Sequence, residues 1–68
     1  MLQEQIGQTA GEIWGFLNGT KKGESTFAAM QKKLEFEGSL GELALGWLAR
    51  EDKIEIAKKG AGLNVKLK

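Results

Sequence analysis

The sequence has no cysteine, histidine, proline or tyrosine. Without cysteine there can be no disulfide, no thiolate nucleophile and no zinc ribbon. Without histidine the chain lacks the commonest general base and the commonest metal ligand. It also has no phosphate-binding GxxxxGK[ST] segment. We therefore expect a binding or assembly module rather than an enzyme, with no metal and no cofactor.

Length and composition limit the architecture. The chain has 68 residues, which is enough for a single hydrophobic core, and we expect one domain over residues 1–68. No apolar run approaches the ~18 residues of a membrane span, so we expect no membrane partner. The first residues also lack the basic and apolar regions of a signal peptide. A cytoplasmic protein is the default expectation.

Two helices are expected in the first half. Residues 2–17 predict a helix because apolar residues recur at spacings of three and four, at Leu2, Ile6, Ala10, Ile13 and Leu17. Residues 20–24 form a loop, ending in a few extended residues. A second helix then begins after a capping hydroxyl and ends near residue 34. Its cap is Ser25 or Thr26, and its apolar residues are Phe27, Met30 and Leu34.

The second half predicts a third helix and a hairpin. Ser39 and Glu42 have the spacing of a capping box, and the helix runs to about Arg50. Its expected buried residues are Leu40, Leu43, Ala44, Trp47 and Leu48. Residues 53–56 and 63–68 then alternate between apolar and polar around a glycine-rich turn at 58–62, which indicates a β-hairpin. Helix, helix-turn-helix and hairpin together predict an α+β winged helix-turn-helix fold.

Two segments carry a resemblance to known proteins. Residues 44–54 (ALGWLAREDKI) and residues 6–14 (IGQTAGEIW) are similar to a family of small stand-alone bacterial winged helix-turn-helix proteins. The resemblance covers nearly the whole chain. It implies the winged-helix fold, and by analogy homodimers and binding to duplex DNA. It carries over no catalytic residue.

The side of the third helix opposite its expected core indicates whether the helix could contact DNA or a second protein chain. A base-reading face normally offers Arg, Lys, Asn or Gln to the groove. Here the face is made of Glu42, Leu45, Gly46 and Ala49, and Arg50 lies at its margin. Three interpretations stay open: ordinary surface, a groove reader that relies on Arg50, or a patch of Leu45, Gly46 and Ala49 on which a second chain packs.

Charge is distributed unevenly along the chain. Residues 35–52 hold Arg50 against five carboxylates, net −4, whereas residues 53–68 hold five lysines against Glu55, net +4. Phosphate neutralisation dominates non-specific DNA affinity, so an acidic recognition helix opposes binding. If DNA binds, the expected contacts are Lys58 and Lys59 at the hairpin tip, supported by Lys21, Lys22 and Lys32-Lys33, with Arg50 the one candidate for a base. The alternative is that these lysines form ordinary solvated surface.

Glycine and tryptophan supply the last signals. Gly7, Gly11 and Gly15 recur every four residues in the first helix, although each costs ~1 kcal/mol of helix stability relative to alanine. Such a stripe lets another helix approach closely, either from the same chain or from a second copy. Trp14 and Trp47 are expected in the core. Two functions therefore stay open: a regulator-like DNA-binding protein, and a homodimeric protein-interaction module that does not bind DNA.

Overall fold

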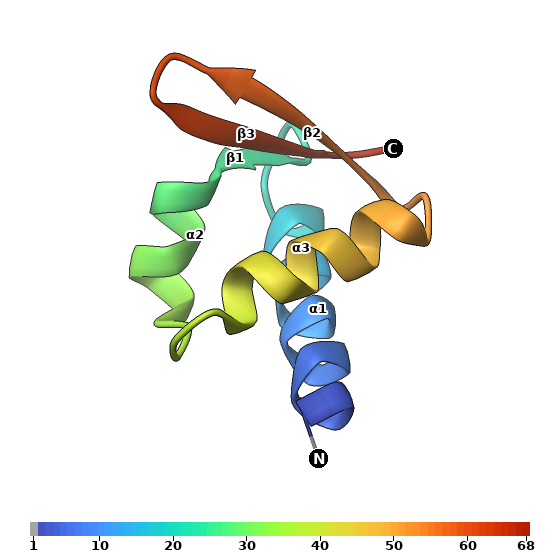
Figure 1. Cartoon of the computed structure of the whole chain (residues 1–68). Helices are drawn as coiled ribbons and strands as arrows, with labels where there is room; N and C mark the ends of the chain where they lie inside the picture. Colours follow the sequence, from blue (N-terminus) through green and yellow to red (C-terminus); the bar gives the residue numbers. More distant parts are fainter. Residues whose placement is uncertain (1) are drawn as a thin grey trace.

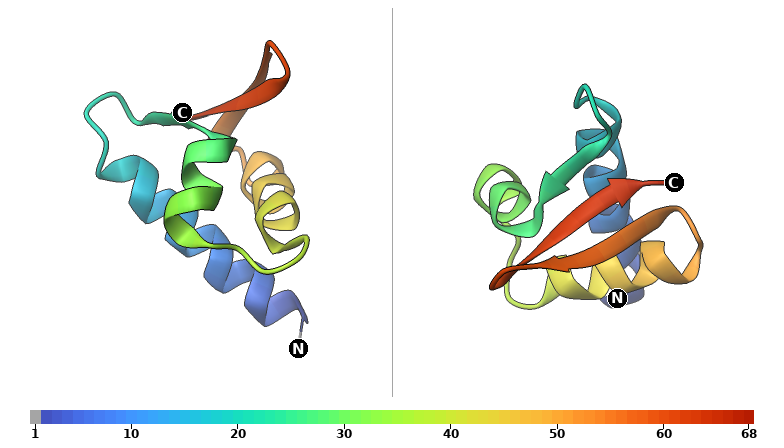
Figure 2. Two further views of the ribbon diagram at one scale, coloured as in Figure 1. Left: turned by 90° about the vertical axis from the view of Figure 1, so that its left-hand side faces the viewer. Right: turned by 90° about the horizontal axis from the view of Figure 1, so that it is seen from above.

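The computed structural model describes residues 2–68 and has the predicted winged-helix order (Figure 1). Its elements are α1 (Leu2–Asn18), β1 (Glu24–Thr26), α2 (Phe27–Leu34), α3 (Leu40–Arg50), β2 (Ile54–Lys59) and β3 (Gly62–Leu67). The three strands form one antiparallel sheet in the order β1-β3-β2, which lies across one end of the helices (Figures 1 and 2). The predicted α+β winged helix-turn-helix is confirmed.

The core lies where the three helices meet the inner face of the sheet. Its buried apolar residues are Ala10, Ile13, Leu17, Met30, Ala44, Leu45, Leu48, Ile54 and Val65. Every element except the short strand β1 contributes at least one of them. The predicted helix at residues 2–17 is present and extends by one residue, to Asn18. At its end the hydroxyl of Thr20 donates a hydrogen bond of 2.8 Å to the carbonyl of Leu17.

The two helices of the helix-turn-helix begin in different ways. The amide of Ala29 donates to the side-chain oxygen of Thr26 at 3.1 Å, so Thr26 is the cap of α2. At α3 the predicted capping box is wrong, because Ser39 makes no side-chain capping bond. A capping serine needs extended backbone, but Ser39 has φ −94° and ψ 8° and continues a turn. Within that turn the amide of Leu40 donates to the backbone carbonyl of Glu37 at 3.1 Å.

Helix α3 is rotated about its axis relative to the sequence-based expectation. It buries Gly41, Ala44, Leu45 and Leu48, whereas the predicted Leu43 and Trp47 are about half exposed. Gly41 explains the rotation. A Cβ placed on Gly41 would lie 2.5 Å from Cδ2 of Phe36 and 3.0 Å from Cζ of Phe27. The glycine therefore lets α3 press its backbone against this aromatic pair, whose ring centroids are 6.0 Å apart.

The hairpin has the predicted strands and turn. Ile54 pairs with Leu67 at its base and Lys59 pairs with Gly62 at its tip, so Gly60 and Ala61 make the turn. Gly60 has φ +62°, a backbone conformation that other L-residues rarely adopt. The short strand β1 pairs with the other edge of β3, from Glu24↔Lys66 to Thr26↔Asn64. The extended residues expected before α2 are therefore the third strand of the sheet.

Candidate interaction surface between α1 and α3

The glycines of α1 face outward. A Cβ placed on Gly7, Gly11 or Gly15 would meet nothing within 4 Å. The expectation that the stripe admits another helix of the same chain is therefore wrong, because no such helix lies against it among residues 2–68. Helix α1 contacts α3 and contributes to the core from the adjacent side, where Ala10 lies in the same buried cluster as Ala44 of α3.

The two tryptophans lie beside these glycines at the surface. Trp14 is 44% exposed and Trp47 is 45% exposed, so the prediction that both are core residues is wrong. Both line a hollow of about 250 Å³ between α1 and α3, together with Gly7 and Gly11. The hollow therefore has a half-exposed indole from each of the two helices. We call the surface of Gly7, Gly11, Trp14 and Trp47 the tryptophan face.

Charged groups lie at one end of the tryptophan face. Trp14 also lines a second hollow, of about 440 Å³, with Asn18, Lys53 and Lys68. Lys53 lines both hollows. The ammonium of Lys68 donates to a carboxylate oxygen of Asp52 at 2.5 Å. This bond and the charge of Asp52 raise the pKa of Lys68 above its usual value.

The other predicted interface residues divide between core and surface. Leu45 is 3% exposed and belongs to the core, so it cannot form the patch expected on α3. Gly46 and Ala49 are exposed, and a Cβ on Gly46 would meet nothing within 4 Å. The exposed side of α3 therefore presents Leu43, Gly46, Trp47, Ala49 and Arg50, with Glu42. This surface is more apolar than the sequence predicted, and Arg50 is still its one basic residue.

The predicted nucleic-acid contacts do not gather in one patch. Lys58 and Lys59 are exposed at the tip of the hairpin, where β3 begins. Lys21 and Lys22 are exposed in the loop before β1, and Glu24 pairs with Lys66 near the end of β3. The length of β3, roughly 16 Å for its six residues, therefore separates the two pairs (Figure 2). Lys58 and Lys59 are also consecutive on a strand, so their side chains leave opposite faces of the hairpin.

Acidic residues lie next to one of the remaining lysines of the sheet. Lys66 on the central strand lies opposite Glu24 on β1 and opposite Glu55 on β2. Directly opposed side chains on antiparallel strands are close enough to interact, so this lysine has carboxylates on both sides. Lys32 and Lys33 lie in the last turn of α2, and Arg50 lies at the end of α3. No continuous basic surface follows from these positions.

Neither a membrane span nor a metal centre is evident in the part of the chain that the structure describes. None of the helices within residues 2–68 is both long enough and apolar enough to cross a bilayer. Over the same residues, no three aspartates or glutamates come together as a group that could hold a metal ion.

Comparison with known proteins identifies the fold family. The model of the winged helix-turn-helix domain family DUF2582 matches residues 1–67. The chain belongs to this family. It is also 39% identical over 64 residues to MJ1608, an uncharacterised protein of Methanocaldococcus jannaschii, and the match covers 94% of this chain and 91% of that protein. Because this relative is archaeal, the narrower expectation of a bacterial family has no support.

The glycine stripe of α1 is visible in the sequence, but the tryptophan face to which Gly7 and Gly11 belong is not. Both tryptophans lie among apolar residues at helical spacing, which predicts burial, so the sequence pattern does not indicate the exposure of Trp14 and Trp47. A usable signal was present in α3. Gly41, Ala44, Leu45 and Leu48 follow the i, i+3, i+4, i+7 spacing as well as the predicted Leu40, Leu43, Ala44 and Trp47 do.

Proposed function

We propose that this winged-helix domain is an assembly module, without catalytic activity, that pairs with a second copy through the tryptophan face. The observation that carries the proposal is the pair of half-exposed indoles beside glycines whose Cβ positions meet no other described element within 4 Å. Aromatic residues dominate the energetics of protein interfaces. Glycines whose Cβ positions are open allow the backbone of a partner helix to approach closely. A small domain without disulfides also commonly gains stability by oligomerising.

Charge complementarity favours a two-fold pair. If two α1 helices cross antiparallel at Gly11, Glu4 lies seven residues before the crossing and faces Asn18, seven residues after it. Asn18 shares a hollow with Lys53 and with the Lys68–Asp52 ion pair. The symmetric arrangement would therefore bring a carboxylate of each copy toward Lys53 of the other, twice. Self-complementary surfaces of this kind close as dimers.

Intrinsic fluorescence tests the proposal directly. The chain has two tryptophans and no tyrosine, and both tryptophans lie on the proposed interface. On dilution from several hundred micromolar, the emission should shift to the red and acrylamide quenching should increase, as sedimentation velocity shows the change from dimer to monomer. Gly11→Leu should remove the concentration dependence. The matched control is Ile56→Ala, which alters an exposed apolar residue of the hairpin. A wild-type protein that remains monomeric at these concentrations refutes the proposal.

Binding of duplex DNA is a second candidate, supported by the exposed lysines of the wing. Lys58 and Lys59 lie at the tip of the hairpin and make no ion pair with any described residue. Because their side chains leave opposite faces of the hairpin, the two lysines would contact different phosphates. Lys58→Ala and Lys59→Ala should each lower the slope of log affinity against log salt by about one if that lysine contacts a phosphate. Lys66→Ala is the control, because it removes a lysine that lies between Glu24 and Glu55 and is not an expected contact. Absence of any salt-sensitive binding to duplex DNA contradicts this candidate. Sequence-specific binding that survives loss of both wing lysines contradicts the role proposed for the wing.

A further inference from the structure

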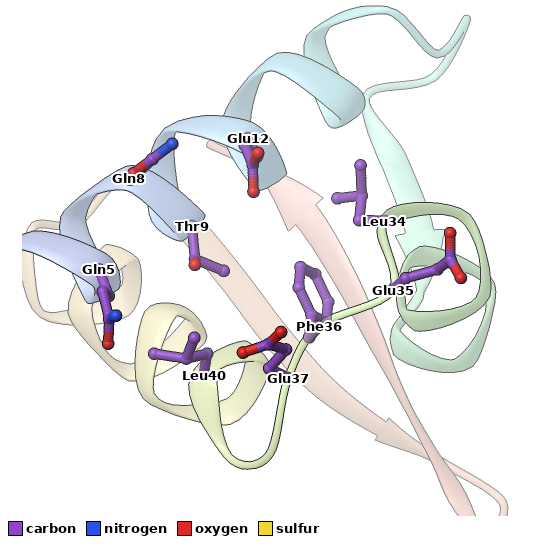
Figure 3. Close-up of a pocket in the computed structure, with 9 residues that line it drawn as sticks. All are labelled: Gln5, Gln8, Thr9, Glu12, Leu34, Glu35, Phe36, Glu37 and Leu40. Carbon is purple, nitrogen blue, oxygen red and sulfur yellow. The ribbon is translucent and has the colours of Figure 1, made fainter. Parts of the chain in front are cut away.

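Figure 3 shows a polar hollow of about 370 Å³ between α1 and the α2–α3 connection. Its lining residues on α1 lie on the opposite side of the helix from the tryptophan face. One wall is the polar side of α1, with Gln5, Thr9 and Glu12, and the other is the α2–α3 connection, with Phe36 and Glu37. Its volume falls within the ~300–1,000 Å³ typical of small-ligand sites.

Thr9 is the unusual residue of this hollow. It is 7% exposed and is the one polar residue in the buried set of residues 2–68. Its hydroxyl makes no hydrogen bond with any described residue, including the carbonyl one turn earlier that helical threonines commonly use. No fully enclosed side-chain polar atom in the described chain lacks a partner, so this oxygen must open onto the hollow. Figure 3 shows the side chain directed into it.

Negative charge converges on the same space. In Figure 3 the carboxylates of Glu12 and Glu37 turn toward the hollow from opposite walls, whereas that of Glu35 points away from it. Neither Glu12 nor Glu37 makes an ion pair with another residue of the described chain. The amide of Gln5 adds another oxygen at the rim. The hollow therefore offers acceptors and negative charge without a cation of its own.

Apolar side chains complete the lining. The ring of Phe36 and the side chain of Leu40 line the hollow on the side of Glu37, across from Glu12 (Figure 3). Both are partly buried, and Phe36 packs against the core. A ligand that matches this site has a positive head with several hydrogen-bond donors and an aliphatic stem. A primary ammonium has three donors and a compact charge, and the aliphatic stem of a lysine buries readily against apolar surface.

We propose that this hollow binds a primary alkylammonium group, with the head between Glu12, Glu37 and the Thr9 hydroxyl and the stem against Phe36 and Leu40. The group can come from a free aliphatic amine or from a lysine side chain of a peptide. The inference is independent of the tryptophan face, because the two surfaces lie on different sides of α1 and share no lining residue.

The test is a titration of isotope-labelled protein, followed through amide chemical shifts. The ligands are n-butylamine, a blocked Gly-Lys-Gly peptide, and n-butanol as a neutral match for the amine. Saturable shifts at residues 5–12 and 34–40 with at least one amine, and none with butanol, are expected. Saturation by butylamine identifies a free amine as sufficient, and saturation by the peptide alone identifies a peptide lysine. Shifts that do not saturate, or that butanol reproduces, overturn the proposal.

Variants separate the site from general electrostatic attraction. Glu37→Gln should weaken the amine about fivefold, as expected for a partly exposed ion pair. Thr9→Val, which keeps the shape of the side chain and removes its acceptor, should have an effect of similar size. Glu35→Gln is the matched control, since it removes the same charge from the same connection but its carboxylate points away. Equal weakening by the Glu35 and Glu37 variants would show a diffuse charge effect and refute a built site.

Discussion

Replacing the open glycines of α1 by alanine should have opposite effects on the monomer and on the proposed dimer. Gly7, Gly11 and Gly15 are interior residues of a helix, and an added Cβ meets no atom within 4 Å at any of them. Glycine costs about 1 kcal/mol relative to alanine in this setting. Each substitution should therefore raise the free energy of unfolding of the dilute protein by about 0.5–1 kcal/mol.

The dimer should respond in the opposite direction. A methyl group at Gly11 occupies the space into which a partner backbone would pack, so Gly11→Ala should weaken association while it stabilises the single chain. Urea unfolding of the dilute protein, followed by circular dichroism, measures the first effect. Sedimentation velocity at high concentration measures the second. No stability mechanism that acts within one chain predicts both signs.

Gly41 and Gly46 in α3 provide matched controls. Gly46 is exposed and open, so Gly46→Ala should also stabilise the dilute protein. At Gly41 the new Cβ would lie 2.5 Å from the ring of Phe36, and overpacking of this kind costs about 1–3 kcal/mol. That cost exceeds the helix-propensity gain, so Gly41→Ala should destabilise the chain. If Gly11→Ala destabilises the dilute protein as Gly41→Ala does, the outward direction of the glycine stripe is wrong.

Three further predictions concern stability. Trp47→Ala should lower the free energy of unfolding by about 1–2 kcal/mol, and Ile13→Ala by about 2–5 kcal/mol, as measured by urea unfolding. The difference is expected because Trp47 is nearly half exposed and Ile13 is fully buried. Equal costs would show that Trp47 is a core residue. Thr26→Ala should lower stability by ~1 kcal/mol and Ser39→Ala by almost nothing, since Thr26 alone caps its helix; a large Ser39 effect would restore the capping box. The pKa of Lys68 is raised in the folded chain, so its protonated ammonium stabilises the fold at pH values below the ordinary lysine pKa of 10.5, and this contribution is lost as the pH rises through the folded-state pKa. The melting temperatures of wild type and Lys68→Ala should therefore converge at pH values above the folded-state pKa. A constant difference at every pH would contradict this.

The order of elements was predictable because each has a local signal in the sequence. The period of apolar residues changes from helical to alternating after Asp52, and the glycine-rich turn marks the wing. Each of these signals comes from residues that are close together in the sequence, so it does not depend on how the elements pack against one another. They also located the boundaries of α1, α2 and α3 to within a residue or two.

The orientation of α3 was not predictable from periodicity alone. Its sequence contains two overlapping apolar stripes, one through Leu43 and Trp47 and the other through Gly41 and Leu45. Hydrophobicity favours the first stripe, but close packing against Phe36 favours the second, because glycine leaves room for the ring. The orientation of α3 is therefore set by a contact between Gly41 and Phe36, which lies outside the helix. The spacing of apolar residues within α3 does not reveal this contact.

The candidate sites depended on the same kind of information. The glycine spacing showed that something could approach α1, but the direction of the stripe is set by how α1 packs on α3. The hollow around Thr9 had no sequence signal, since a threonine among polar residues of a helix is ordinary. Its burial arises only when the α2–α3 connection folds over α1.

The exposed side of α3 now links the two candidate functions. Trp47 belongs to the tryptophan face and also to the side of α3 that would enter a DNA groove. A second copy seated on Trp47 would therefore cover the helix that would read bases if the protein binds DNA. The wing remains free, because its lysines lie at the far end of β2 from the base where Lys53 meets the tryptophan face. Assembly and phosphate contacts through the wing are thus compatible, whereas assembly and base reading through α3 compete. Any sequence-specific DNA binding should consequently weaken as the protein is concentrated into dimers, while salt-sensitive binding through the wing should not.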